Sequence, residues 1–170
     1  HVARPMLSNA LVPIRTEERY APPRHIHLIA SRQLGGAERI ILDIAQGVHE
    51  LRGYIDIIVL HQARDEYTHA PRPGIRFHYI HHLHRHQQIT YIAGIAAGQD
   101  LPIYTHLIRD HFLADLWKER VHTIPVIHND TQGWKNTPTT WQDNPRVPAV
   151  IACGQHVAHP LTQHGFTGPL

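Results

Sequence analysis

The stretch that decides the fold is residues 25–60, which read HIHLIASRQLGGAERIILDIAQGVHELRGYIDIIVL. Residues 25–30 have the apolar character of a buried strand, and after a turn the apolar side chains of residues 40–51 recur at helical spacing. Gly53 ends that helix, and residues 54–60 are almost all apolar, as in a strand covered on both faces. A strand, a helix and a second strand in this order predict a right-handed βαβ unit.

The rest of the chain continues this alternation. Residues 61–74 and 129–147 are predicted as loops, because they are polar and contain prolines. The fold class that we expect is therefore α/β, a Rossmann-like parallel sheet of about six or seven strands flanked by helices. The further strands are predicted at residues 75–80, 102–106, 124–128 and 149–152, and the further helices at residues 89–98, 108–119 and 155–164.

The first part of the chain differs from the rest. Residues 1–24 have no clear periodicity and contain four prolines, so we interpret them as an N-terminal extension or linker. Residues 25–170 are interpreted as one domain, and a chain of 170 residues is long enough for one hydrophobic core. Because the chain begins with His1 rather than Met, we expect it to be a piece of a longer protein.

Composition and charge narrow the classes of function. Lys plus Arg number 16 and Asp plus Glu number 14, an excess too small to favour a nucleic-acid-binding protein. No apolar run approaches the roughly 18 residues that a membrane span needs, and a single cysteine cannot form an internal disulfide. We therefore expect a cytoplasmic protein that can lie at the periphery of an anionic membrane surface. The chain has 18 histidines, which would add positive charge below about pH 6.

Gly35 and Gly36 lie between the first predicted strand and its helix. Ligands of parallel α/β sheets bind beyond the carboxyl ends of the strands, and the backbone N–H groups of a helix N-terminus attract phosphate. Two glycines let a diphosphate approach the backbone without obstruction by a Cβ atom. The pattern is neither GxGxxG nor a P-loop, so it favours neither a dinucleotide nor phosphoryl transfer from ATP. The alternative is a plain tight turn with no ligand.

Four motifs together resemble one known family. Residues 31–39, SRQLGGAER, resemble the GGAE turn and first helix of the family 4 glycosyltransferases, which are retaining enzymes with a GT-B fold. Residues 104–106, YTH, resemble the strand end that leads to the family's acceptor region, and residues 124–129, IPVIHN, resemble its strand ending in histidine. Residues 150–157, VIACGQHV, resemble a segment near the end of its N-terminal domain. The resemblance covers residues 25–166 and implies the N-terminal, acceptor-side half of a GT-B fold.

The resemblance implies an activity and its partners. Family members move a sugar from a nucleotide-diphosphate donor to a hydroxyl acceptor, with retention at the anomeric carbon. Their second domain holds the nucleotide and most of the donor sugar, so this chain alone is expected to be inactive. The expected partners are a sugar nucleotide, a carbohydrate or lipid-linked acceptor, and a C-terminal donor domain or partner chain. No cofactor or metal is implied, and the sequence has no DxD-like motif.

His128 is the candidate catalytic residue. It ends a predicted strand, so its side chain can face the interdomain cleft, and the resemblance implies that it lies beside the donor sugar. Hydrogen bonds from such a group orient the sugar and stabilise developing charge. The alternative is a structural histidine of the core or the surface. Asn129 and Asp130 follow on the same loop and are candidates for binding acceptor hydroxyls, with turn formation as the alternative.

Further acceptor-binding candidates lie near the other predicted strand ends. His106 and Arg109 flank a strand-to-helix turn, where Arg109 can bind an anionic acceptor such as a lipid phosphate. A solvated residue in the first helical turn is the alternative for Arg109. Trp134 and Trp141 lie in the long loop, where an aromatic face can stack on a sugar or can serve only in loop packing.

Two more patterns allow a chemical and a structural interpretation. Cys153 precedes the last predicted helix, where a helix N-terminus can activate a thiol, although a small buried thiol is the ordinary case. Five histidines occur within residues 78–86, a run that can bind Zn²⁺ or Ni²⁺ but lacks the ligand spacing of a defined site.

Three other functions fit the same residues. The chain can be a non-enzymatic binding module, one subunit of a split glycosyltransferase, or half of a GT-B epimerase. Co-purification with a second chain would favour the split enzyme.

Overall fold

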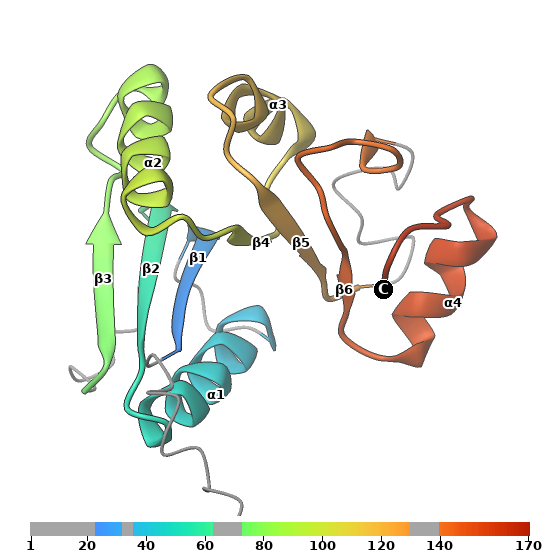
Figure 1. The fold of residues 1–170 in the computed structure, drawn as a ribbon, viewed down its shortest axis with the longest axis horizontal. Helices are drawn as coiled ribbons and strands as arrows, with labels where there is room; N and C mark the ends of the chain where they lie inside the picture. The colour runs from blue at the N-terminus through green and yellow to red at the C-terminus, as the bar shows by residue number, and fades with distance from the viewer. Residues whose placement is uncertain (1–22, 32–35, 63–72, 130–139) are drawn as a thin grey trace, which may run out of the picture.

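Within residues 23–31, 36–62, 73–129 and 140–170, which the computed structural model describes, the chain forms one sheet of six parallel strands. Their order is β3-β2-β1-β4-β5-β6 (Figure 1). This arrangement confirms the predicted α/β, Rossmann-like fold class. The strands are β1 (Arg24–Ser31), β2 (Tyr54–His61), β3 (Ile75–Tyr79), β4 (Ile103–His106), β5 (Thr123–Ile127) and β6 (Ile151–Ala152).

The helices form layers on the two faces of the sheet. Helix α1 covers one face, α2 and α3 cover the other, and α4 lies beside β6 (Figure 1). The apolar stripe of α1, which includes Ile41 and Ala45, packs against Ile55 and Ile57 of β2. Alternate side chains of the same strand, such as Ile58, pack on α2 and α3 instead. The helices are α1 (Gly36–Glu50), α2 (Arg85–Gln99), α3 (Asp110–Lys118) and α4 (Gln155–Gln163).

Two helices begin at residues that differ from the sequence prediction. Helix α2 begins four residues before Ile89, because the side chain of Gln87 accepts a hydrogen bond from the His84 backbone N–H (3.0 Å) and stabilises a polar first turn. Helix α3 begins at Asp110 rather than Ile108, because Arg109 has the extended backbone of an N-cap residue (φ −75°, ψ 146°).

The last helix is fixed to the sheet by a third apolar cluster, in which Val150 and Trp141 pack against Val157 and Leu161 of α4. Trp141 is only 2% exposed, so our hypothesis that it stacks on a sugar is wrong and the packing alternative is confirmed. Trp134 lies outside the described residues.

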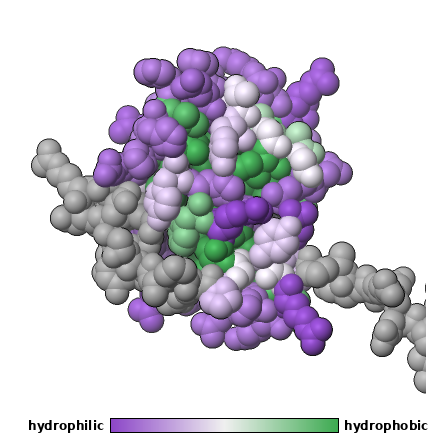
Figure 2. Space-filling model, turned by 90° about the vertical axis from the view of Figure 1, so that its left-hand side faces the viewer, coloured by the Kyte–Doolittle hydropathy of each residue, from purple (hydrophilic) through white to green (hydrophobic). Residues whose placement is uncertain are grey.

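The surface beside the edge strand β3 is mostly hydrophilic, with smaller hydrophobic areas between the polar residues (Figure 2). Arg76 of β3 has a side chain that is 60% exposed. Charged side chains on an edge strand disfavour pairing with the edge of another sheet. Among the described helices, none is long and apolar enough to cross a membrane.

The strand order places a switch point between β1 and β4. The chain runs outward from β1 to β2 and β3, then returns through α2 to β4 on the other side of β1. Ile29 of β1 is in register with His106 of β4, so these two strands end at nearly the same level. Ligands of such sheets bind beyond the carboxyl ends of the strands at this point.

Candidate functional site

A cavity of about 390 Å³ lies at the carboxyl ends of β1, β4 and β5, beside the first turn of α1. We call it the histidine pocket. Its volume falls within the range of small-molecule sites. Its wall includes Gly36, His106, His128, Asn129, Cys153 and His156.

Candidate residues from separate sequence motifs meet at this pocket. Gly36, His106, His128 and Asn129 all line it, although they come from three different segments of the chain. Arg109 lies in a neighbouring cavity, separated from the histidine pocket by Leu107. Three further candidates, Gly35, Asp130 and Trp134, lie outside the described residues.

Three imidazoles form a hydrogen-bonded row that leads from the sheet to the pocket. His27 Nδ1 lies 2.9 Å from His106 Nε2, and His106 Nδ1 lies 2.9 Å from His128 Nε2. At the end of the row, His128 Nδ1 lies 3.5 Å from the sulfur of Cys153. We call His27, His106 and His128 the histidine chain. It runs from β1 through β4 to the residue that follows β5, and the ring of Tyr104 stacks on His27 with a centroid distance of 5.0 Å.

Burial keeps these rings neutral near pH 7. His27 and His106 are each 1% exposed. Burial, together with repulsion from His25, lowers the pKa of His27 to about 3. Burial also lowers the pKa of His106 well below its usual value, and repulsion from His27 and His128 adds to this effect. The pKa of His128 is lowered by burial as well.

Neutral rings give the histidine chain a direction. A neutral imidazole has one N–H donor and one acceptor nitrogen, so all three rings must point the same way. If the bonds run toward His27, its Nε2 carries a proton, yet this buried atom has no hydrogen-bond partner among the described residues. An unpaired buried donor costs about 1–3 kcal/mol, and unpaired buried N–H groups are rarer than unpaired acceptors. The unpaired Nε2 atom of His27 therefore favours hydrogen bonds that run from His27 to His128, with the proton of each ring on Nδ1.

This direction presents a donor at the pocket. His128 Nδ1–H points toward Cys153, whose sulfur is a weak acceptor at a distance of 3.5 Å. A ligand oxygen would be a stronger acceptor, so this is the contact that a ligand can replace. The Nε2 atom stays fixed by His106. Both nitrogens of His106 are occupied within the chain, which leaves it able to orient His128 rather than to bind a ligand through nitrogen.

Cys153 does not have the properties of an activated nucleophile. Burial raises the pKa of its thiol, so the thiol stays protonated near neutral pH. The hypothesis of a reactive thiolate at the start of α4 is therefore wrong, and the ordinary half-buried thiol fits.

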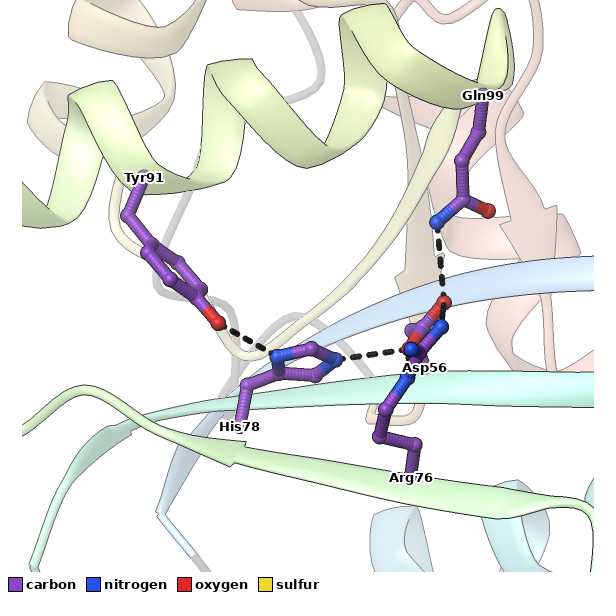
Figure 3. A network of polar contacts seen from close by, with 5 residues as sticks. All are labelled: Asp56, Arg76, His78, Tyr91 and Gln99. Atoms are coloured by element: carbon purple, nitrogen blue, oxygen red, sulfur yellow. Dashed lines mark hydrogen bonds and ion pairs between the residues drawn. The ribbon is translucent and has the colours of Figure 1, made fainter.

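A second polar network, around Asp56, was missed by the sequence analysis (Figure 3). The buried carboxylate of Asp56 accepts hydrogen bonds from Arg76, from His78 Nε2 at 2.7 Å and from Gln99 at 3.0 Å. The Nδ1 atom of His78 also lies 2.6 Å from the hydroxyl of Tyr91. Burial by itself raises the pKa of Asp56, but the hydrogen bonds from its partners outweigh burial and lower it. The network thus joins β2, β3 and α2.

The histidine run of residues 78–86 does not gather around one point. His78 is engaged with Asp56 and Tyr91, while the rings of His84 and His86 stack on each other with centroids 6.3 Å apart. In the part of the chain that the structure describes, no three His, Cys, Asp or Glu side chains are grouped to hold a metal ion.

Comparison with known proteins adds no relative. No model of a protein family matches the chain, and a search of curated proteins finds no match.

Proposed function

We propose that this chain is the acceptor-side domain of a retaining glycosyltransferase, which moves a sugar from a nucleotide-diphosphate donor to a hydroxyl of an acceptor. One observation carries the proposal. Gly36, His106 and His128 were selected from three separate motifs of the sequence, and they line a single pocket at the switch point of the sheet. Such a meeting is expected if the motifs belong to one site.

The first turn of α1 suits the donor diphosphate. The first N–H groups of a helix have no partner within the helix, and the helix dipole makes this end positive. Gly36 begins α1 at the pocket, and a Cβ atom placed on it would meet nothing within 4 Å. A diphosphate can therefore approach the backbone there. When the bond to the anomeric carbon breaks, negative charge collects on the departing diphosphate, which this end of α1 stabilises.

His128 would act as a positioned hydrogen-bond donor. Its Nδ1–H, directed by His27 and His106, would bind a hydroxyl of the donor sugar in place of the Cys153 sulfur. A donor that is already oriented gives up little freedom when the transition state forms. Asn129, which is exposed on the pocket wall, can bind an acceptor hydroxyl. The proposal leaves recognition of the base and ribose to a second domain or partner chain.

The first prediction tests this role of His128 in the enzyme that combines this chain with its donor domain or partner chain. His128→Ala should reduce kcat/KM by on the order of 10²-fold, the usual loss for a transition-state hydrogen bond. The melting temperature should fall by only about 2–4 °C, because one hydrogen bond worth about 1 kcal/mol is lost. Steady-state kinetics with a panel of sugar nucleotides and thermal melts provide the measurements.

The control for this experiment is His82→Ala, because His82 is exposed outside both pockets and should change neither quantity. Near-native activity of His128→Ala would show that His128 does not bind the donor sugar in the transition state. Rapid sugar transfer by the 170-residue chain alone would contradict the proposal that a second domain or partner chain is needed to bind the donor.

A further inference from the structure

A second cavity, of about 410 Å³, lies on the other side of Leu107 from the histidine pocket. It lies near the carboxyl ends of β1 and β2, where helices α2 and α3 begin. We call it the basic pocket. The two pockets share Ala30, Ser31 and Leu107 in their walls, so a ligand seated in one reaches the edge of the other.

The wall of the basic pocket is cationic. Arg85, Arg109, His61 and His111 all line it, and no acidic side chain is among the described residues of the wall. Among the described residues, the guanidinium of Arg109 forms no ion pair with an acidic side chain. Asp110, on the same turn, accepts a hydrogen bond from Thr140 (3.2 Å) and does not line the pocket.

Neighbouring groups hold the rest of the wall in place. Arg85 donates to the carboxylate of Asp115 at 2.6 and 2.9 Å and to the backbone carbonyl of His111 at 2.7 Å, which fixes its side chain across α2 and α3. Gln88 is buried, and its amide nitrogen donates to the carbonyls of Leu60 and Ile80. Each of those two carbonyl oxygens thus accepts a hydrogen bond from Gln88.

We propose that the basic pocket binds a phosphate group carried by the acceptor. A phosphate offers several acceptor oxygens to donors of Arg109, His61 and His111, which line the same cavity, and an arginine can bind it with two parallel hydrogen bonds. The positive ends of α2 and α3 favour the same charge. The cavity is larger than a single ion requires, and Phe112 and Ile108 supply apolar wall for the adjoining part of the acceptor.

This assignment rests on the proposed function and makes it more specific. With its phosphate beside Arg109, an acceptor would pass over Leu107 and bring a hydroxyl to the histidine pocket, where the sugar is transferred. Phosphate binding itself needs neither a sugar nucleotide nor a donor domain. The binding test and the His128 test can therefore fail separately, and each failure is distinguishable.

The second prediction concerns binding by the 170-residue chain. Backbone NMR titrations with inorganic phosphate and with glycerol 3-phosphate should shift the amides around His61, Arg109 and His111 more than those around Gly36. Arg109→Gln should weaken this binding by about tenfold, since a charged bidentate contact is lost. Arg120→Gln is the matched control, because it removes the same charge at the other end of α3 and should leave binding unchanged.

Three binding experiments distinguish a soluble acceptor from a lipid acceptor and test whether the pocket prefers phosphate. Binding of soluble glycerol 3-phosphate that depends on Arg109 supports a soluble acceptor. Binding that depends on Arg109 only with vesicles containing phosphatidic acid, and not with phosphatidylcholine alone, supports a lipid acceptor. Tighter binding of succinate than of phosphate would overturn the phosphate assignment. Equal losses in Arg109→Gln and Arg120→Gln, or no binding that depends on Arg109 in any arm, would overturn the pocket as a site.

Discussion

Two buried polar networks in this molecule both contain histidine, yet they are built in opposite ways. The carboxylate of Asp56 is ionised and receives hydrogen bonds from Arg76, His78 and Gln99, so its charge is compensated. The histidine chain has no counter-charge: its rings are neutral, and His27 Nε2 has no partner among the described residues. The Asp56 network lines none of the described pockets, whereas the histidine chain ends in one.

This difference indicates which network serves structure and which serves chemistry. A buried charge with several donors holds elements together, here β2, β3 and α2. A row of buried neutral bases leaves Nε2 of His27 without a partner among the described residues, and it ends in a pocket at the carboxyl ends of a parallel sheet, which favours a functional role. The following predictions separate the two by stability, by pH dependence and by reactivity, beginning with the largest expected effect.

The third prediction is that Asp56→Ala lowers the free energy of unfolding at pH 7 by about 3 kcal/mol. The substitution removes a buried carboxylate and leaves its hydrogen-bond donors without an acceptor. Arg76→Gln should cost much less, since Arg76 is 60% exposed and water replaces its ion pair. Urea unfolding of both variants gives the comparison. A loss below about 0.5 kcal/mol for Asp56→Ala would show that the network does not stabilise the fold.

The fourth prediction concerns acid. The pKa of His27 is lowered from about 6.5 in the unfolded chain to about 3, so the unfolded state binds the extra proton between these values. Stability from His27 is complete above pH 6.5 and falls as the pH drops toward 3, by up to about 1.4 kcal/mol per pH unit. The lowered pKa of Asp56 acts in a different window: its stabilisation is present above about pH 3.9 and is lost as the pH falls through the folded value.

Urea unfolding between pH 7 and pH 5 measures the effect of His27 alone, because Asp56 stays ionised throughout this range. His27→Phe removes one titrating ring, so its stability should decline less steeply with acid than that of the parent chain, whatever its stability at pH 7. The exposed residue His82 gives the control, and His82→Gln should keep the parent slope. An unchanged slope in His27→Phe would mean that His27 is not held neutral by the fold.

The fifth prediction has the smallest effect. Cys153→Ser should change the free energy of unfolding by no more than about 0.5 kcal/mol, because the contact of the sulfur with His128 is long and weak. Iodoacetamide should alkylate Cys153 more slowly at pH 8 than it alkylates a free thiol, since burial raises the pKa. Rapid alkylation would place an activated thiolate at the end of the histidine chain and reopen a chemical role for Cys153.

The sequence was sufficient to predict the fold but only part of the site. Apolar periodicity is a local property, and it located every strand and helix that the structure describes. The starts of α2 and α3 were misplaced, because Gln87 caps the first turn of α2 and Arg109 is extended before α3. His27 was not selected from the sequence, because its contact with His106 depends on the register between β1 and β4. Asp56 was missed because it lies within an apolar run, and its partners come from residues 20 to 43 positions away.

Leu107 gives the switch point a property that neither pocket has alone. Its φ of 57° is uncommon for a bulky residue, and the left-handed conformation costs roughly 1–2 kcal/mol that a glycine would not incur. A glycine there would remove the ridge that both cavities share. In the proposed enzyme, Leu107 would separate the donor sugar in the histidine pocket from the acceptor phosphate in the basic pocket, and the acceptor hydroxyl would reach the sugar across this side chain. Access of water to the activated sugar would then depend on how completely the acceptor covers one leucine.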